Sequence, residues 1–113
     1  MANKYPHTPD GRYFVAKNRL WRCTDPGLSE DEKRTHIKSL MKARRAVRSA
    51  QQQNDETALR QAREGVQAAK EALGERGPVW WQDGAPDEGG FAPHNSSYAN
   101  WWREYRHPLQ YSL

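Results

Sequence analysis

The tryptophans of this chain are unevenly placed, because four of the five lie in its last third, at Trp80, Trp81, Trp101 and Trp102. The glycines and prolines of the same region predict turns instead of long helices or strands. Large, rigid aromatic rings dominate the energetics of cores and interfaces. This tail, residues 77–113, must therefore fold back on its own chain or form a surface for a partner, and the sequence leaves both open.

Length and composition predict one small domain. A chain of 113 residues can bury enough surface for a single core, so residues 1–113 are expected to form one domain. Only 35% of the residues are hydrophobic, which makes the core depend on its aromatic side chains. Aromatic residues are scarce in disordered segments, so the tail is expected to be ordered.

Residues 10–23 predict a β-hairpin, because two short runs rich in aromatic and branched residues flank Lys17 and Asn18. A two-residue turn there pairs Tyr13 with Arg22, Phe14 with Trp21, Val15 with Leu20 and Ala16 with Arg19. A lone two-stranded hairpin is marginal in water. We therefore expect it to pack on the helices or to gain a third short strand at residues 79–81.

Two amphipathic helices are predicted in the middle of the chain. Ser29 and Glu32 form a capping-box pattern that starts a helix over residues 29–52. A second helix over 55–74 carries apolar residues at three- and four-residue steps and ends at Gly74. A short polar link between two helices is typical of an antiparallel helical hairpin. A further short helix is expected from 97 to 106, capped at Ser96 or Ser97.

These elements predict an α+β fold. An N-terminal β-hairpin packs on a central antiparallel two-helix hairpin, and the irregular aromatic tail, residues 77–113, covers both.

Basic residues are concentrated in the first half of the chain. Residues 1–53 carry seven more basic than acidic side chains, and the first helix has no acid after Glu32. At 100° per residue, one side of that helix presents a basic stripe that suits a phosphate backbone. The stripe consists of Arg34, Lys38, Lys42 and Arg45, with Arg48 beside it.

The ordinary interpretation of this stripe is a solvated face paired with acids of the second helix. Folding the helical hairpin near Asn54 would bring Lys42 to Glu64, Lys38 to Glu71 and Arg34 to Glu75. We favour this paired face over a polyanion site, because charged helix faces are common without any ligand. Arg44 falls instead on the apolar side of the helix, where its stem can cover the core edge and its head can reach solvent, Asp83 or Asp87. The alternative, which we favour less, is a preorganised anion-binding arginine.

The aromatic clusters allow three interpretations. Aromatic rings interleaved with Arg19, Arg22, Arg103 and Arg106 are typical of proteins that stack single-stranded bases. Packing in the core is favoured, because the chain has few aliphatic residues with which to build one. Trp, Tyr and Arg are also the residue types enriched in protein–protein hot spots.

Catalysis has little support in the sequence. Cys23 stands beside Arg22, which favours a thiolate, but no histidine is spaced to form a dyad with it. Asp83, Asp87 and His94 share no recognised metal-ligand spacing. We expect no catalytic residues, no metal and no cofactor. With a single cysteine, no apolar run long enough to span a membrane and an N-terminus unlike a signal peptide, the chain is expected to be cytoplasmic.

Two sequence blocks carry a resemblance to a known family. They are Pro9–Val15 with Arg19–Cys23, and Ala72–Trp81 continuing through Asp83–Asp87. Over most of its length the chain resembles a family of short uncharacterised bacterial proteins. The resemblance implies this class of protein and a bacterial origin, and it implies no activity. The stretch Glu88–His94 departs from the family pattern, which has basic residues there.

The sequence thus predicts a non-enzymatic binding module without a membrane segment, whose oligomeric state is open. A protein partner is the first expectation, bound by Trp80, Trp81, Trp101 and Trp102 with the rim of the β-hairpin. Nucleic acid is the second, bound by the basic stripe of the first helix together with Arg19 and Arg22. An unrecognised enzyme is a distant third.

Overall fold

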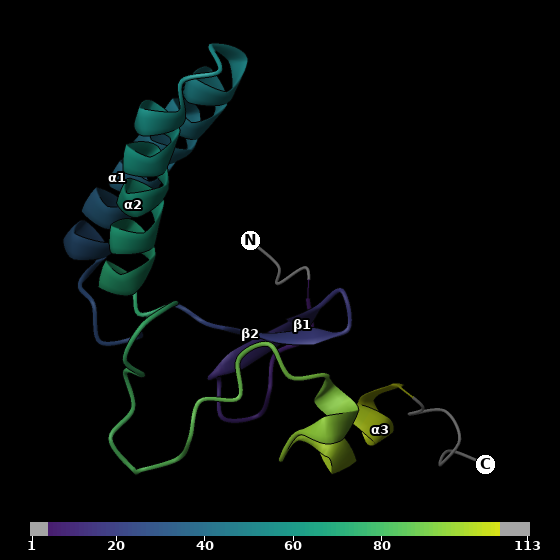
Figure 1. The fold of residues 1–113 in the computed structure, drawn as a ribbon. Helices are drawn as coiled ribbons and strands as arrows, with labels where there is room; N and C mark the ends of the chain where they lie inside the picture. Colours follow the sequence, from purple (N-terminus) through teal and green to yellow (C-terminus); the bar gives the residue numbers. More distant parts are fainter. Residues whose placement is uncertain (1–4, 107–113) are drawn as a thin grey trace. The chain divides into compact units, whose positions relative to one another are not determined.

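The computed structural model describes residues 5–106, which form two compact units (Figure 1). The terminal unit comprises residues 5–23 and 83–106, and the helical unit comprises residues 24–82. The fold is α+β, as predicted, with a β-hairpin followed by two helices packed together and a short C-terminal helix. The single domain expected from the chain length stays a prediction.

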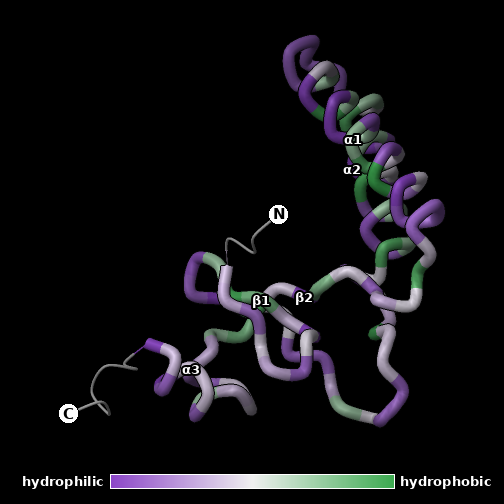
Figure 2. The backbone as a smooth tube through the Cα atoms, turned by 180° about the vertical axis from the view of Figure 1, so that it is seen from behind, coloured by the Kyte–Doolittle hydropathy of each residue, from purple (hydrophilic) through white to green (hydrophobic). Residues whose placement is uncertain are grey.

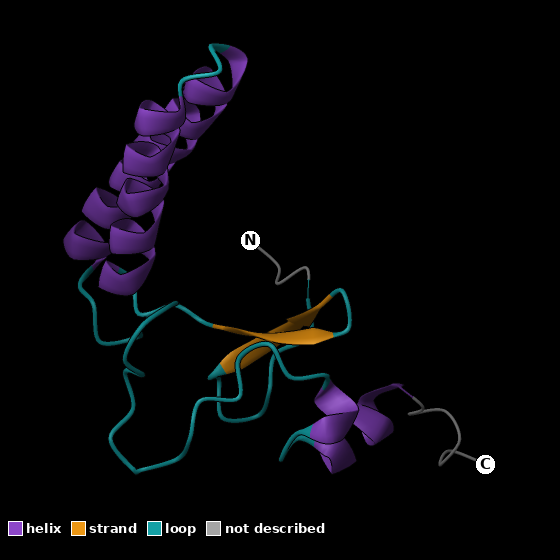
Figure 3. Ribbon diagram, in the orientation of Figure 1, coloured by secondary structure: helices purple, strands orange, loops and turns teal. Residues whose placement is uncertain are grey.

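The β-hairpin of the terminal unit has the predicted register. Strands β1 (Tyr13–Ala16) and β2 (Arg19–Arg22) are antiparallel, and all four residue pairs are those expected from a turn at Lys17 and Asn18 (Figure 3). Both turn residues have positive φ, 53° and 59°, as a type I′ turn requires. The turn therefore determines which side chains share a face of the hairpin.

The alternative of a third strand at residues 79–81 is not borne out, because these residues adopt no strand conformation. The edge of β1 is instead occupied by residues just before it in the chain. His7 bridges to Phe14, and the Val15 amide donates to the carbonyl of Pro6 at 2.9 Å. A neighbouring segment reaches a strand edge at a smaller entropic cost than one more than sixty residues away.

The tail is joined to β2 by backbone hydrogen bonds. The Leu20 amide donates to Phe91 O at 2.9 Å, and the Gly90 amide donates to Leu20 O at 2.8 Å, where the tail passes along β2 (Figure 1). Beyond this contact the tail forms a 3₁₀ turn, η1 (Pro93–Asn95), and helix α3 (Ala99–Arg106). The predicted short helix is thus present but begins at Ala99. The core of this unit consists of Tyr13, Val15, Leu20 and Pro93.

The helical unit is built on an antiparallel pair, α1 (Glu30–Gln52) and α2 (Glu56–Ala72). Ser29 and Glu32 form the predicted capping box of α1, and Asp55 caps α2 by accepting from the Ala58 amide. The turn between the helices is hydrophilic (Figure 2). The helices meet through a small core made by Leu40, Ala69 and Leu73, with Leu28 and Val66 packed against it.

A compact connection closes the end of α2. The Asp25 amide donates to Leu73 O at 2.9 Å, and the Thr24 hydroxyl donates to Glu75 at 2.6 Å. Gly74 has a φ of +80°, a left-handed conformation that glycine adopts at low cost. Among the helices that the structure describes, none combines the length and apolarity needed to cross a membrane.

Replacing Gly74 by alanine should destabilise the helical unit strongly. A Cβ atom at this position would lie 2.8 Å from Asp25 Cβ and 3.0 Å from Trp80 Cδ1, in addition to the strain of positive φ. Gly77→Ala is the matched control, because its φ is +71° but the atoms nearest to its Cβ would be those of the flexible side chain of Glu71. Urea unfolding should show Gly74→Ala to be at least about 1 kcal/mol more costly than Gly77→Ala. Equal losses would contradict the close packing at Gly74.

Candidate functional site

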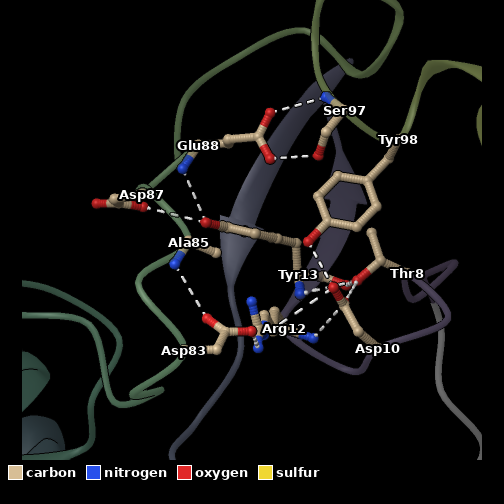
Figure 4. A network of polar contacts seen from close by, with 10 residues as sticks. All are labelled: Thr8, Asp10, Arg12, Tyr13, Asp83, Ala85, Asp87, Glu88, Ser97 and Tyr98. Atoms are coloured by element: carbon tan, nitrogen blue, oxygen red, sulfur yellow. Dashed lines mark hydrogen bonds and ion pairs between the residues drawn. The ribbon is translucent and has the colours of Figure 1, made fainter.

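A polar network around Tyr13 holds the tail against the β-hairpin (Figure 4). The Tyr13 hydroxyl accepts from the Glu88 amide at 2.8 Å and donates to Asp87 at 3.4 Å. The Tyr98 ring stands edge-on to Tyr13, with centroids 5.6 Å apart, and its hydroxyl donates to Asp10 at 2.7 Å. Two phenols thus connect residues before and within β1 to two points of the tail.

Charged residues complete the same network. Asp10 also accepts from the Thr8 hydroxyl at 2.7 Å, and Arg12 forms an ion pair with Asp83. The Glu88 carboxylate accepts from both the amide and the hydroxyl of Ser97. Every member of the network therefore has a partner inside the terminal unit.

In this network the pKa values of the two tyrosines are raised and those of two aspartates are lowered, so all four lie further from pH 7 than usual. Burial raises the pKa of Tyr13 to about 12, and burial with the hydrogen bond to Asp10 raises the pKa of Tyr98. Burial opposes ionisation of Asp10, but hydrogen bonds from Tyr98, Thr8 and the Arg12 amide lower its pKa overall. The hydrogen bond from Arg12 lowers the pKa of Asp83. At neutral pH the tyrosines therefore stay protonated and the aspartates stay ionised. Fixed protonation states suit anchoring of the tail and do not suit proton transfer.

Alkaline pH should destabilise the terminal unit through the buried phenols. Between pH 10.0, where a free tyrosine ionises, and the raised pKa of about 12, the unfolded chain has lost a proton that folded Tyr13 retains. The free energy of unfolding must therefore fall as the pH rises through this window. Tyr13→Phe should reduce this slope in urea titrations, whereas Tyr105→Phe, at an exposed position, should leave it unchanged. Identical slopes in all three proteins would refute the assignment.

The uncovered side of the β-hairpin is an aromatic face, defined as Tyr5, His7, Phe14 and Trp21. Phe14 and Trp21 are opposite each other across the strands, and Tyr5 stacks on Phe14 with centroids 5.7 Å apart. Trp21 is 45% exposed and Tyr5 is 44% exposed. The indole N–H of Trp21 donates to Ala16 O at 2.8 Å, which fixes the ring on the strand surface.

The tail tryptophans expected to bind a partner are largely covered. Trp81 is buried and lies edge-on to half-buried Trp80, with centroids 5.2 Å apart. Trp101 and Trp102 are half-buried: Trp102 stacks on Tyr105 with centroids 5.9 Å apart, and Trp101 contacts Tyr105 at a tilt, with centroids 5.7 Å apart. The most exposed tryptophan of the described chain is Trp21, which was not among the predicted binding residues. The alternation of the strand, which puts Phe14 and Trp21 on one face, was the signal that could have found it.

The two arginines of β2, Arg19 and Arg22, differ in exposure. Arg22 lies inside the terminal unit, with a side chain only 5% exposed and 3.7 Å from Asp87. Arg19 is exposed, and its guanidinium donates to Gly90 O at 2.9 Å. Arg19 is thus accessible to a partner, whereas Arg22 contributes to the packing of the tail.

The predicted neutralisation of the basic stripe is wrong. Within the described structure, none of the three expected cross-helix pairs forms: Arg34 pairs with Asp31 of its own helix at 3.1 Å. Glu75 is engaged by Lys70 at 2.9 Å and by Thr24. The other members of the stripe are exposed: Lys38, Lys42, Arg45 and Arg48.

Helix geometry explains why the pairs do not form. Lys38 is two residues from core residue Leu40, which places it about 160° around α1 from the helix contact. Glu64 and Glu71 are each two residues beyond buried alanines of α2, at Ala62 and Ala69, and point away by the same angle. The basic side of α1 and the acidic side of α2 are therefore opposite outer faces, too far apart for ion pairs.

The structure gives the residues considered for catalysis separate roles and different partners. Asp83 pairs with Arg12 and caps the Ala85 amide, while Asp87 accepts from Tyr13 and from the Gly89 amide. His94 belongs to η1 and is exposed, and Cys23 is half-buried and forms no disulfide. Residues 5–106 contain no group of three His, Cys, Asp or Glu side chains that could hold a metal ion.

Comparison with known proteins adds no assignment. No protein family model, no curated protein and no solved structure matches this chain. The resemblance to a family of short bacterial proteins stays a prediction.

Proposed function

We propose that this protein is a non-enzymatic binding module that recognises another protein through the aromatic face of its β-hairpin. The observation that carries the proposal is the exposure of Trp21 beside stacked Tyr5 and Phe14. Tryptophan and tyrosine are the side chains that most often dominate protein–protein binding energy. The single cysteine, Cys23, supports a reducing compartment such as a cytoplasm for this activity.

The construction of the terminal unit supports the same proposal. Tyr13, Val15 and Leu20 fill the opposite face of the hairpin and are buried, so the unit does not need the aromatic face for its own core. The hydrogen bond from Trp21 to Ala16 O holds the ring in place before binding. A preorganised ring loses little side-chain entropy when a partner covers it, which favours affinity.

Trp21→Ser should weaken binding of the protein partner at least about tenfold, because loss of a central aromatic anchor typically costs about 2 kcal/mol or more. Partners would be recovered on immobilised protein after nuclease digestion, and the affinity of each purified partner measured by biolayer interferometry. Tyr5→Ser is a second variant, since the Tyr5 side chain stacks on Phe14 and has no hydrogen bond or ion pair with the other described residues. Met41→Ser on α1, which is 53% exposed, is the control. Unchanged binding by both aromatic variants would reject the proposal.

A second candidate function is nucleic-acid binding by the outer face of α1. It is favoured by the absence of cross-helix pairs at Lys38, Lys42, Arg45 and Arg48 within the described structure. Between residues 33 and 52 the helix carries seven basic and no acidic side chains. Each phosphate that such a row neutralises releases counterions, so affinity would fall steeply as salt increases.

Charge reversal tests this second candidate. Lys38→Glu combined with Lys42→Glu should abolish binding of labelled RNA and DNA in fluorescence anisotropy at low salt. Arg60→Glu combined with Arg103→Glu changes the net charge equally at exposed positions on α2 and α3, and should retain most of the binding. Equal losses in the two double variants would leave only non-specific attraction by net charge, and the candidate would be rejected.

A further inference from the structure

One flank of the helical unit carries a second cationic surface, the arginine groove. Arg44 and Arg48 of α1, Arg63 of α2 and Arg76 beyond α2 surround a floor that contains Val47 and Val66. The groove has a volume of about 600 Å³, within the range of ligand sites. Charge and apolar surface thus occur together between two packed helices.

The arginines of this groove have not been neutralised by the protein itself. Arg44, Arg48 and Arg63 are exposed and form no ion pair among the described residues. Arg76 donates to the neutral amide oxygen of Gln67 at 2.9 Å. Among the described residues, no carboxylate lines the groove. Like charges held this close raise the local positive potential, which an anionic ligand would relieve.

The chemistry of the groove indicates which anion would bind. Arginine guanidinium groups bind carboxylates in a planar, two-pronged geometry, and their stems extend the apolar floor. Nucleic acid is disfavoured here, because the described lining contains no aromatic ring on which a base could stack. A bare phosphate would leave Val47 and Val66 unused.

We propose that the arginine groove binds an acidic segment of a partner protein, one that places an apolar side chain on the valine floor between carboxylates held by arginines. A segment laid along two helices in this way is a recurrent mode of peptide recognition. The site lies in the helical unit and is separate from the aromatic face of the terminal unit. It therefore extends the proposed function to a second, chemically different contact.

The probe is a short fluorescent peptide in which leucines recur at three- and four-residue steps among glutamates. Anisotropy would be measured on the full chain. Arg44→Gln combined with Arg63→Gln should weaken binding at least about tenfold, because it removes one guanidinium from each wall. Arg45→Gln combined with Arg60→Gln is the matched control, since it removes the same charges from the same helices at exposed positions outside the groove. Circular dichroism would verify that both double variants keep their helices.

The outcomes separate the proposal from its competitors. Loss of binding in the groove variant alone, with weaker binding of a peptide whose leucines are replaced by serine, would support it. Equal losses in both double variants, or equal binding of the leucine-free peptide, would overturn it in favour of diffuse charge attraction. It would also be overturned if Arg44 and Arg63 were needed for RNA binding or for self-association in sedimentation but not for peptide binding. The aromatic-face variants Trp21→Ser and Tyr5→Ser should bind the peptide normally, so the two proposals can fail independently.

Discussion

The terminal unit depends on the buried phenol of Tyr13. Its hydroxyl contacts Asp87 and the Glu88 amide, which lie 74 and 75 residues further along the chain. The tail between residues 83 and 92 has no helix or strand of its own, so hydrogen bonds to the hairpin must fix its position. A buried tyrosine suits this role, because its ring fills the core while its hydroxyl satisfies polar groups of the tail. Because burial raises the pKa of Tyr13 to about 12, its phenol stays protonated at neutral pH and keeps these contacts.

Anchoring the tail on one side gives the two faces of the hairpin different roles. The side with Tyr13, Val15 and Leu20 becomes a core, and the side with Phe14 and Trp21 stays accessible. The tail tryptophans, which cluster in sequence, mostly pack on one another and on nearby rings. In this chain the sequence clusters of aromatic residues therefore mark internal packing, and the exposed Trp21 marks the surface that we propose for binding.

The features predicted from sequence are those that local rules determine. The turn at Lys17 and Asn18 specifies the hairpin register, and Ser29 with Glu32 specifies the start of α1. The predictions that failed concern residues far apart in the chain. The edge of β1 was taken by residues 6–8, and the acids expected to neutralise α1 point away from it. The sequence did not predict the arginine groove, because two of its arginines, Arg63 and Arg76, come from α2 and the segment after it.

The helical hairpin is thin, and this determines what its surface can do. Two helices whose contact is made largely by alanine and a few leucines cannot bury the long side chains along their flanks. Arginine is suited to such flanks, since its stem covers apolar surface while its charge remains in water. In this chain, however, the acids of α1 are confined to its first turn and those of α2 lie mainly on the outer face. Like charges without acidic partners on one flank repel one another and slightly destabilise the folded state. A bound anion would remove this repulsion. The separation of acids from arginines thus favours binding at the groove over stability of the free helical unit.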